Sequence, residues 1–140
     1  MKLRMIPLVG TLLILACAHD PVPTAQTVAT AIPQLKGTWE GEHRSYFRGS
    51  TSASHMRITI TEQDGETFRG VYEWTGHGRQ GQERIIGVIG FDGRTISIVE
   101  EPDLGRIDAE LVGPDKMRAV YVEAGEGAGV FRVELTRTSK

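Results

Sequence analysis

The stretch ITITEQDGETFRGVYEW, residues 58–74, holds two runs in which apolar and polar side chains alternate, separated by Asp64 and Gly65. Apolar residues at every second position are typical of a β-strand with one buried face. An Asp-Gly pair favours the two-residue turn of a β-hairpin, because both residues tolerate the positive φ of a type I′ turn. This stretch therefore predicts an antiparallel hairpin, and its pattern recurs along the chain.

Turn signals of this kind recur at short spacing from residue 35 onward, and no segment between them shows a helical period. A second Asp-Gly pair stands at 92–93, and the tight-turn sequences PDLG and GPDK stand at 102–105 and 113–116. The signals separate eight predicted strands: Gly37–Phe47, His55–Glu62, Glu66–Thr75, Glu83–Phe91, Arg94–Glu100, Arg106–Val112, Lys116–Ala124 and Val130–Thr138. Longer glycine- or serine-rich loops are expected at 48–54, 76–82 and 125–129.

Connections of this length favour one architecture. A parallel sheet would need crossover helices, for which there is no room. A Greek-key sandwich would need at least one long connection, and only residues 48–54 approach that length. Closing the sheet on itself removes both edge strands. We therefore predict an all-β fold, an up-and-down antiparallel barrel of eight strands, over residues 35–140.

The alternation also assigns one face of every strand to the barrel interior. In the first strand, Trp39, His43 and Phe47 share the inward face with Gly41 and Ser45. The large inward residues of the other strands are Met56, Ile58, Ile60, Phe68, Tyr72, Trp74, Ile85, Ile89, Phe91, Ile96, Ile98, Ile107, Leu111, Met117, Tyr121, Phe131, Val133 and Leu135. Side chains of this bulk can fill an eight-stranded barrel. Glycine and alanine at other inward positions leave space, so a filled barrel and a ligand cavity both stay open.

The N-terminal residues resemble a bacterial export signal. A short basic start precedes an apolar run, residues 5–15, that is too short to span a membrane. The run ends in ILAC, residues 14–17, which resembles the lipobox of bacterial lipoproteins, where the cysteine is acylated and becomes the mature N-terminus. The small residues at 16–18 also fit the cleavage site of an ordinary secreted protein. We expect acylation of Cys17, because it is the only cysteine of the chain and this use gives it a function.

Three segments follow from this interpretation. Residues 1–16 form the signal peptide, and residues 17–34 form the lipidated cysteine and a disordered tether, with three prolines and no aromatic side chain. Residues 35–140 form the barrel domain. Ala18 rather than aspartate follows the cysteine, which in a Gram-negative cell resembles an outer-membrane sorting signal. We expect a protein of the bacterial cell envelope that faces the periplasm and is held by its acyl chains.

Charge and composition argue against several classes of function. Removal of Lys2 and Arg4 with the signal leaves 14 basic against 18 acidic side chains, a net charge of −4. This balance argues against nucleic acid, which requires a basic surface. The four histidines have no close pair and no cysteine cluster beside them, so no metal site is predicted. We expect no cofactor, no catalytic residue and no enzymatic activity, because no nucleophile and base stand in a recognisable arrangement.

The first and last predicted strands resemble those of a known superfamily. LKGTWEGE, residues 35–42, is similar to the Gly-x-Trp start of the calycins, which include lipocalins and avidins. VELTRT, residues 133–138, resembles the last strand of those barrels, where a basic residue often packs over the first-strand tryptophan. The resemblance implies an eight-stranded barrel closed by Trp39 and Arg137, a pairing that cation–π attraction also favours. It implies no ligand, because the biotin-binding set of avidins and the further lipocalin motifs are missing.

The barrel interior offers the first candidate site. Aromatic walls with a few polar groups are typical of small-ligand pockets. The candidate ligand-binding residues, for a small apolar or amphipathic molecule, are Trp39, His43, Tyr72, Trp74 and Tyr121. The phases of their strands also allow Glu100 and Glu123 to lie near a barrel mouth.

The outer wall offers the alternative. Val71, Ile86, Val88 and Val99 are expected to face outward on three neighbouring strands and to form one apolar patch. A patch of this kind favours a protein partner or a homo-oligomer. It also has a simpler explanation, since β-branched residues favour strands whichever way they face.

Overall fold

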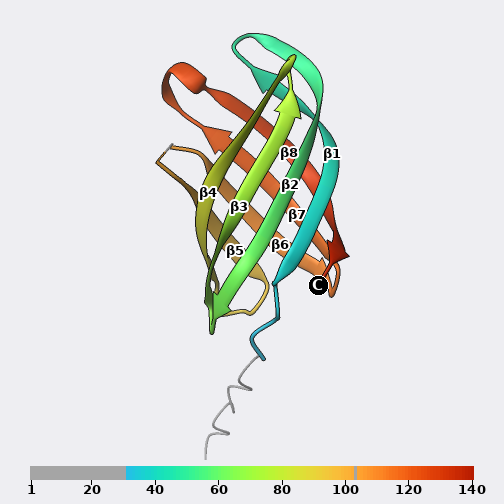
Figure 1. Ribbon diagram of the computed structural model, residues 1–140, viewed down its shortest axis with the longest axis vertical. Helices are drawn as coiled ribbons and strands as arrows, with labels where there is room; N and C mark the ends of the chain where they lie inside the picture. The colour runs from blue at the N-terminus through green and yellow to red at the C-terminus, as the bar shows by residue number, and fades with distance from the viewer. Residues whose placement is uncertain (1–30, 103) are drawn as a thin grey trace, which may run out of the picture.

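Eight antiparallel strands follow one another around a closed barrel in the computed structural model, which describes residues 31–102 and 104–140 (Figure 1). The strands are β1 (Gly37–Phe47), β2 (Ser50–Asp64), β3 (Thr67–Gly76), β4 (Arg79–Ile89), β5 (Thr95–Glu101), β6 (Arg106–Gly113), β7 (Lys116–Glu123) and β8 (Gly129–Ser139). One 3₁₀ turn, η1 (Gly125–Gly127), precedes β8. The predicted all-β, up-and-down barrel is confirmed. The signal sequence, Cys17 and the tether up to residue 30 lie outside the described residues.

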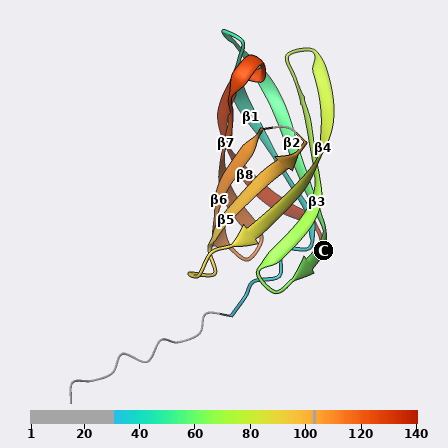
Figure 2. The ribbon, with the colours of Figure 1, turned by 90° about the vertical axis from the view of Figure 1, so that its left-hand side faces the viewer.

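Each strand pairs with its neighbours in sequence, and β1 also pairs with β8, which closes the sheet and removes both edges. The turns therefore alternate between two ends. We call the end with the β1–β2, β3–β4, β5–β6 and β7–β8 turns the mouth, and the end where the chain enters the barrel the floor. Figure 2 shows residues 31–36 entering the barrel at the floor, opposite the mouth turns.

Two expected loops are strand, which corrects the prediction for residues 48–54 and 76–82. The β1–β2 connection is the dipeptide Arg48-Gly49, with φ of 47° and 82°, and the β3–β4 connection is His77-Gly78, with φ of 52° and 68°. Positive φ at both residues matches the twist of the flanking strands. Glycine adopts positive φ readily at the second position, but arginine and histidine do so less readily at the first. The sequence therefore indicates a loop at each place and does not indicate its two-residue length.

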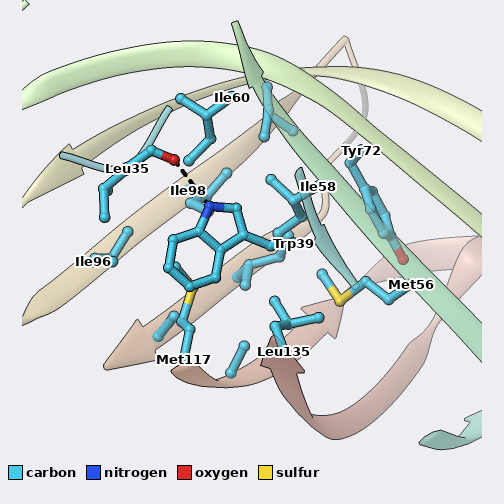
Figure 3. Packing of buried hydrophobic residues seen from close by; sticks show 14 of the residues in the cluster. Leu35, Trp39, Met56, Ile58, Ile60, Tyr72, Ile96, Ile98, Met117 and Leu135 are labelled. Carbon is cyan, nitrogen blue, oxygen red and sulfur yellow. Dashed lines mark hydrogen bonds between the residues drawn. The ribbon is translucent and has the colours of Figure 1, made fainter. Parts of the chain in front are cut away.

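Large apolar side chains fill the floor half of the barrel. Its fully buried members include Leu35, Trp39, Ile58, Ile85, Ile96, Ile98, Ile107, Met117 and Leu135. They come from the N-terminal segment and seven of the eight strands, and Figure 3 shows several of them around the Trp39 ring. The predicted inward alternation holds for these residues. Phe91 is the exception and is fully exposed, because β4 ends at Ile89 and a turn closed by Gly93 N–H to Gly90 O (2.9 Å) carries Phe91 outward.

The outer wall carries several charged pairs that join neighbouring strands. Arg57 on β2 lies 3.8 Å from Glu73 on β3, and Arg94 lies 2.7 Å from Glu110 on β6. Each such exposed pair contributes little to stability. Over the described residues, no helix has the length and apolar character needed to cross a membrane.

Candidate functional site

The mouth half of the barrel is hollow. A cavity of about 290 Å³ lies there, at the small end of the range for ligand pockets (about 300–1,000 Å³). The side chains that line it include His43, Ser45, Phe47, Ser54, Tyr72, Trp74, His77, Glu83, Glu100, Tyr121, Glu123 and Phe131. The interior is therefore filled at the floor and open at the mouth. The sequence left a filled barrel and a ligand cavity open, and each of these describes one half of the interior.

Four of the five predicted ligand-binding residues line this mouth cavity: His43, Tyr72, Trp74 and Tyr121. Trp39 does not line it. Its side chain is fully buried at the floor, where its indole N–H donates to the carbonyl of Leu35 (2.9 Å, Figure 3). Trp39 lies at the floor end of β1, below Gly41 and His43, so the alternation that assigned it correctly to the interior did not assign its height.

Stacked rings form one wall of the mouth cavity. The centroid of His43 lies 3.9 Å from that of Phe131, and Phe131 lies 4.8 Å from Tyr121, with interplanar angles of 21° and 10°. Tyr121 lies 5.9 Å from Tyr72 at a tilted angle of 41°. The four rings come from β1, β8, β7 and β3 and form a continuous aromatic wall across the barrel. Contacts of this geometry add to the stabilisation from burial.

Acidic groups form the wall nearest to β4, β5 and β7. The hydroxyl of Tyr121 lies 3.0 Å from an oxygen of Glu123 and 3.3 Å from an oxygen of Glu100, and Glu100 is 6% exposed. Glu83 is half-buried and pairs across the sheet with Tyr72. Three carboxyl groups therefore share one side of a small cavity.

Burial and these carboxylates both raise the pKa of Tyr72 and of Tyr121 well above the ordinary tyrosine value. Burial is the larger cause for each. Both hydroxyls therefore stay protonated at neutral pH, and that of Tyr121 donates to the neighbouring carboxylate of Glu123. Burial also lowers the pKa of His43, which keeps its ring neutral at neutral pH.

A serine and histidine network lies opposite, at the β1–β2 side of the mouth. The Oγ atom of Ser45 lies 2.7 Å from Oγ of Ser54 and 2.9 Å from Nε2 of His77. Nδ1 of His77 lies 3.3 Å from Oγ of Ser50, and its backbone N–H donates to Oγ of Ser52 (3.2 Å). The β3–β4 turn is thereby fixed to β1 and β2. The sequence did not predict this network, because His77 was expected to lie in a loop.

A serine beside a histidine raises the question of nucleophilic catalysis. The catalytic arrangement needs a third group, commonly a carboxylate, to orient the histidine and stabilise its cation. In this network, Nδ1 of His77 faces the hydroxyl of Ser50 instead. Ser54 also shares the hydroxyl of Ser45, so both nitrogens of the His77 ring face serine hydroxyls within one hydrogen-bonded network.

Two basic residues belong to the rim of the mouth cavity. Arg48 and Arg79 lie in or beside the mouth turns and are exposed. Nε of Arg48 donates to the carbonyl of Glu126 (3.2 Å), and its guanidinium lies 5.1 Å from the centroid of Phe47. In the described part of the chain, no group of three histidine, cysteine, aspartate or glutamate residues is placed to hold a metal ion.

The predicted outer apolar patch is smaller than expected. Ile86, Val88 and Val99 are 44%, 46% and 44% exposed, and Ile86 pairs directly with Val99 across β4 and β5. Val71 is half-buried. It pairs with Arg84 on β4 rather than with Ile86, so it does not lie directly beside the other three residues. The three exposed residues, which we call the outer apolar patch, also border a shallow hollow that reaches Phe68.

Comparison with solved structures finds the same barrel architecture. The barrel EF1p2_mFAP2b bound to DFHBI is 15% identical, with a TM-score of 0.56 over 74% of this chain and 94% of that chain. The redesigned barrel mFAP0 bound to DFHBI is 15% identical, with a TM-score of 0.53 over 74% and 98% of the two chains. A fluorescence-activating β-barrel designed de novo is 13% identical, with a TM-score of 0.50 over 74% and 93%. At these identities the likeness is one of fold.

No protein-family model matches the sequence, and a search of curated proteins gives no match. The class that the structure defines is therefore an eight-stranded antiparallel barrel with a small cavity at its mouth.

Proposed function

We propose that this protein is a lipid-anchored binding protein of the bacterial envelope, whose barrel holds a small amphipathic molecule in the mouth cavity. The observation that carries the proposal is the difference between the floor half and the mouth half of the barrel interior. The floor is packed with apolar side chains, whereas the mouth encloses about 290 Å³ between aromatic walls and polar groups. A concave, partly apolar space with a few converging polar groups is the usual form of a small-molecule site.

Two of the barrels with similar architecture were solved bound to DFHBI. That likeness supports the view that a barrel of this size can hold a small molecule. The role that we propose is non-enzymatic. The anchoring part rests on the lipobox-like residues 14–17 and the tether, which would hold the barrel close to the membrane surface.

The binding proposal is tested by filling the mouth cavity. The full-length protein is purified from its own cells, and small molecules released on denaturation are identified by mass spectrometry. We expect Ser45→Phe, which places a ring in the cavity, to lose the released molecule. Arg44→Phe is the control, because Arg44 is the outward neighbour on the same strand. Equal recovery from both variants, each shown to be folded by circular dichroism, would contradict the proposal.

The outer apolar patch supports a second candidate, a protein-interaction role as an assembly factor, an inhibitor or an oligomer subunit. Ile86, Val88 and Val99 lie together and are each nearly half exposed. In this case Val88→Glu would dissociate a complex seen by size-exclusion chromatography, and Ser45→Phe would leave it intact. A size that does not change in Val88→Glu would exclude the patch as the interface.

A further inference from the structure

We propose that the mouth cavity selects an organic cation, a small amine in its protonated form with an aromatic or apolar body. This inference rests on the proposed ligand-binding function and specifies the chemical class of the ligand.

The carboxyl groups of Glu83, Glu100 and Glu123 converge on the cavity from β4, β5 and β7. Tyr121 bridges two of them, with its hydroxyl 3.0 Å from Glu123 and 3.3 Å from Glu100. Glu83 precedes Ile85 by one inward position, and Ile85 pairs with Glu100 across the sheet. All three carboxylates contribute to raising the pKa of the Tyr72 hydroxyl, so all three lie within electrostatic reach of one point.

The arginine side chains that line the cavity lie nearer to solvent than the three carboxyl groups do. The basic residues that line the mouth cavity, Arg48 and Arg79, are exposed at its rim, and Arg48 is turned toward the carbonyl of Glu126. His43 lies deeper, but burial lowers its pKa and keeps it neutral at neutral pH. Among the described residues that line the cavity, carboxyl groups therefore outnumber the charged basic side chains. A cleft lined mainly by one sign of charge concentrates ligands of the opposite sign.

The aromatic wall favours the same ligand. The face of a tyrosine, tryptophan or phenylalanine ring attracts a cation through its quadrupole, and aromatic rings recur in sites for ammonium groups. Tyr72, Trp74 and Tyr121 lie on the side of the cavity that also holds the carboxylates. One ammonium group can thus contact ring faces and a carboxylate together, while the apolar body of the ligand lies against Phe131.

The carboxylates are not arranged for a metal ion in the described residues, which favours an organic cation over an inorganic one. A volume of about 290 Å³ further limits the ligand to a molecule of one or two rings.

Three indoles of nearly equal size separate charge from shape: tryptamine is cationic, tryptophol is neutral and indole-3-acetate is anionic. We would titrate each into the full-length chain, in a non-ionic detergent at pH 7 and low salt, by isothermal titration calorimetry. We expect tryptamine to bind at least about tenfold more tightly than tryptophol, since one favourable charge contact corresponds to about that factor. Indole-3-acetate should bind more weakly than either.

Variants identify the groups responsible. Glu123→Gln should weaken tryptamine binding by about tenfold and leave tryptophol binding unchanged. Glu83→Gln, at a half-buried position on another strand, should do the same. Glu66→Gln is the matched control, because it removes one negative charge from an exposed position near the floor and should change neither affinity.

Tryptophol or indole-3-acetate binding as tightly as tryptamine would overturn the cation proposal and leave the ligand-binding function standing. Tryptamine binding that both Glu→Gln variants leave unchanged would overturn it as well. If none of the indoles binds, the cation proposal is overturned, and the mass of the purified protein then decides whether the cavity holds any ligand.

Discussion

The guanidinium of Arg137 lies 4.3 Å from the centroid of the Trp39 ring, and this contact joins the last strand to the first at the floor of the barrel. The Arg137 side chain is 8% exposed and also contacts the carboxylate of Asp115 (3.3 Å) and the carbonyl of Gln34 (2.5 Å). It therefore covers the buried indole with a charge that is itself partnered. The calycin resemblance implied this pairing, and the structure places the two residues in contact.

Arg137→Ala should lower the free energy of unfolding by about 2–3 kcal/mol, because it removes the cation–π contact with Trp39, the ion pair with Asp115 and the hydrogen bond to the Gln34 carbonyl. Arg137→Lys should lose about half of that, since an ammonium lacks the planar stack. The measurement is urea unfolding followed by circular dichroism. Arg132→Ala, at an exposed position on the same strand, should cost less than about 0.5 kcal/mol. An equal cost for Arg132→Ala and Arg137→Ala would show that the floor contact does not stabilise the barrel.

Alkaline pH should destabilise the protein through its buried tyrosines. The unfolded chain ionises tyrosine near pH 10, whereas the raised pKa of Tyr72 keeps it protonated in the fold. The unfolded state then binds fewer protons, so the free energy of unfolding falls as pH rises above about 10. Each such tyrosine should account for a loss of about 1.4 kcal/mol by pH 11.

Tyr72→Phe should remove one such contribution, measured as a smaller shift of the urea midpoint between pH 9 and pH 11. Tyr46→Phe is the control, because Tyr46 is 51% exposed. A pH dependence that is identical in both variants would show that Tyr72 is not buried among carboxylates as described.

The His77 network should control how firmly the mouth is held. His77→Ala removes both hydrogen bonds of the ring, to Ser45 and Ser50, and places alanine at a φ of 52°. We expect amide hydrogen exchange in residues 75–80 to rise by about tenfold or more, while β5 and β6 keep their protection. His77→Asn tests the ring alone, since asparagine tolerates the left-handed conformation. Unchanged exchange in both variants would mean that the network does not restrain the turn.

The proposed lipid anchor on Cys17 is tested by fractionation. Cys17→Ser should release the protein from the membrane fraction of a Gram-negative host, because serine cannot carry the thioether-linked lipid. Ala18→Asp is the matched control and should keep the protein in the membrane fraction while changing its sorting. Membrane retention of Cys17→Ser would refute the lipoprotein interpretation.

The fold was predictable because its signals are local. Asp64-Gly65 and the alternation on either side of it predict a hairpin without reference to the rest of the chain. The Asp-Gly pair at 92–93 predicts a second hairpin in the same way. The two mouth turns at Arg48 and His77 were predicted as longer loops, because arginine and histidine favour positive φ less than the glycines that follow them. Local sequence therefore predicted the strands and missed two of their ends.

The candidate site was predictable only in part. Alternation shows that a side chain faces inward, but the height of the residue in the barrel depends on the stagger between strands. This explains why Trp39 was assigned to the ligand site although it lies at the floor, and why Glu83 was not noticed. Ser54 was missed for another reason, because residues 48–54 were expected to form a loop. Contacts between distant strands, such as Ser45 with His77, require the register of the closed sheet.

The central claim is that the mouth cavity holds a small molecule, and the native mass of the intact protein tests it most directly. The full-length chain would be purified gently from its own cells, without organic solvent, and analysed by native mass spectrometry. We predict one discrete additional mass per barrel, small enough for a cavity of about 290 Å³ and lost on unfolding. A bare mass, whether of a monomer or of an oligomer, would contradict the claim and favour a role for the outer apolar patch.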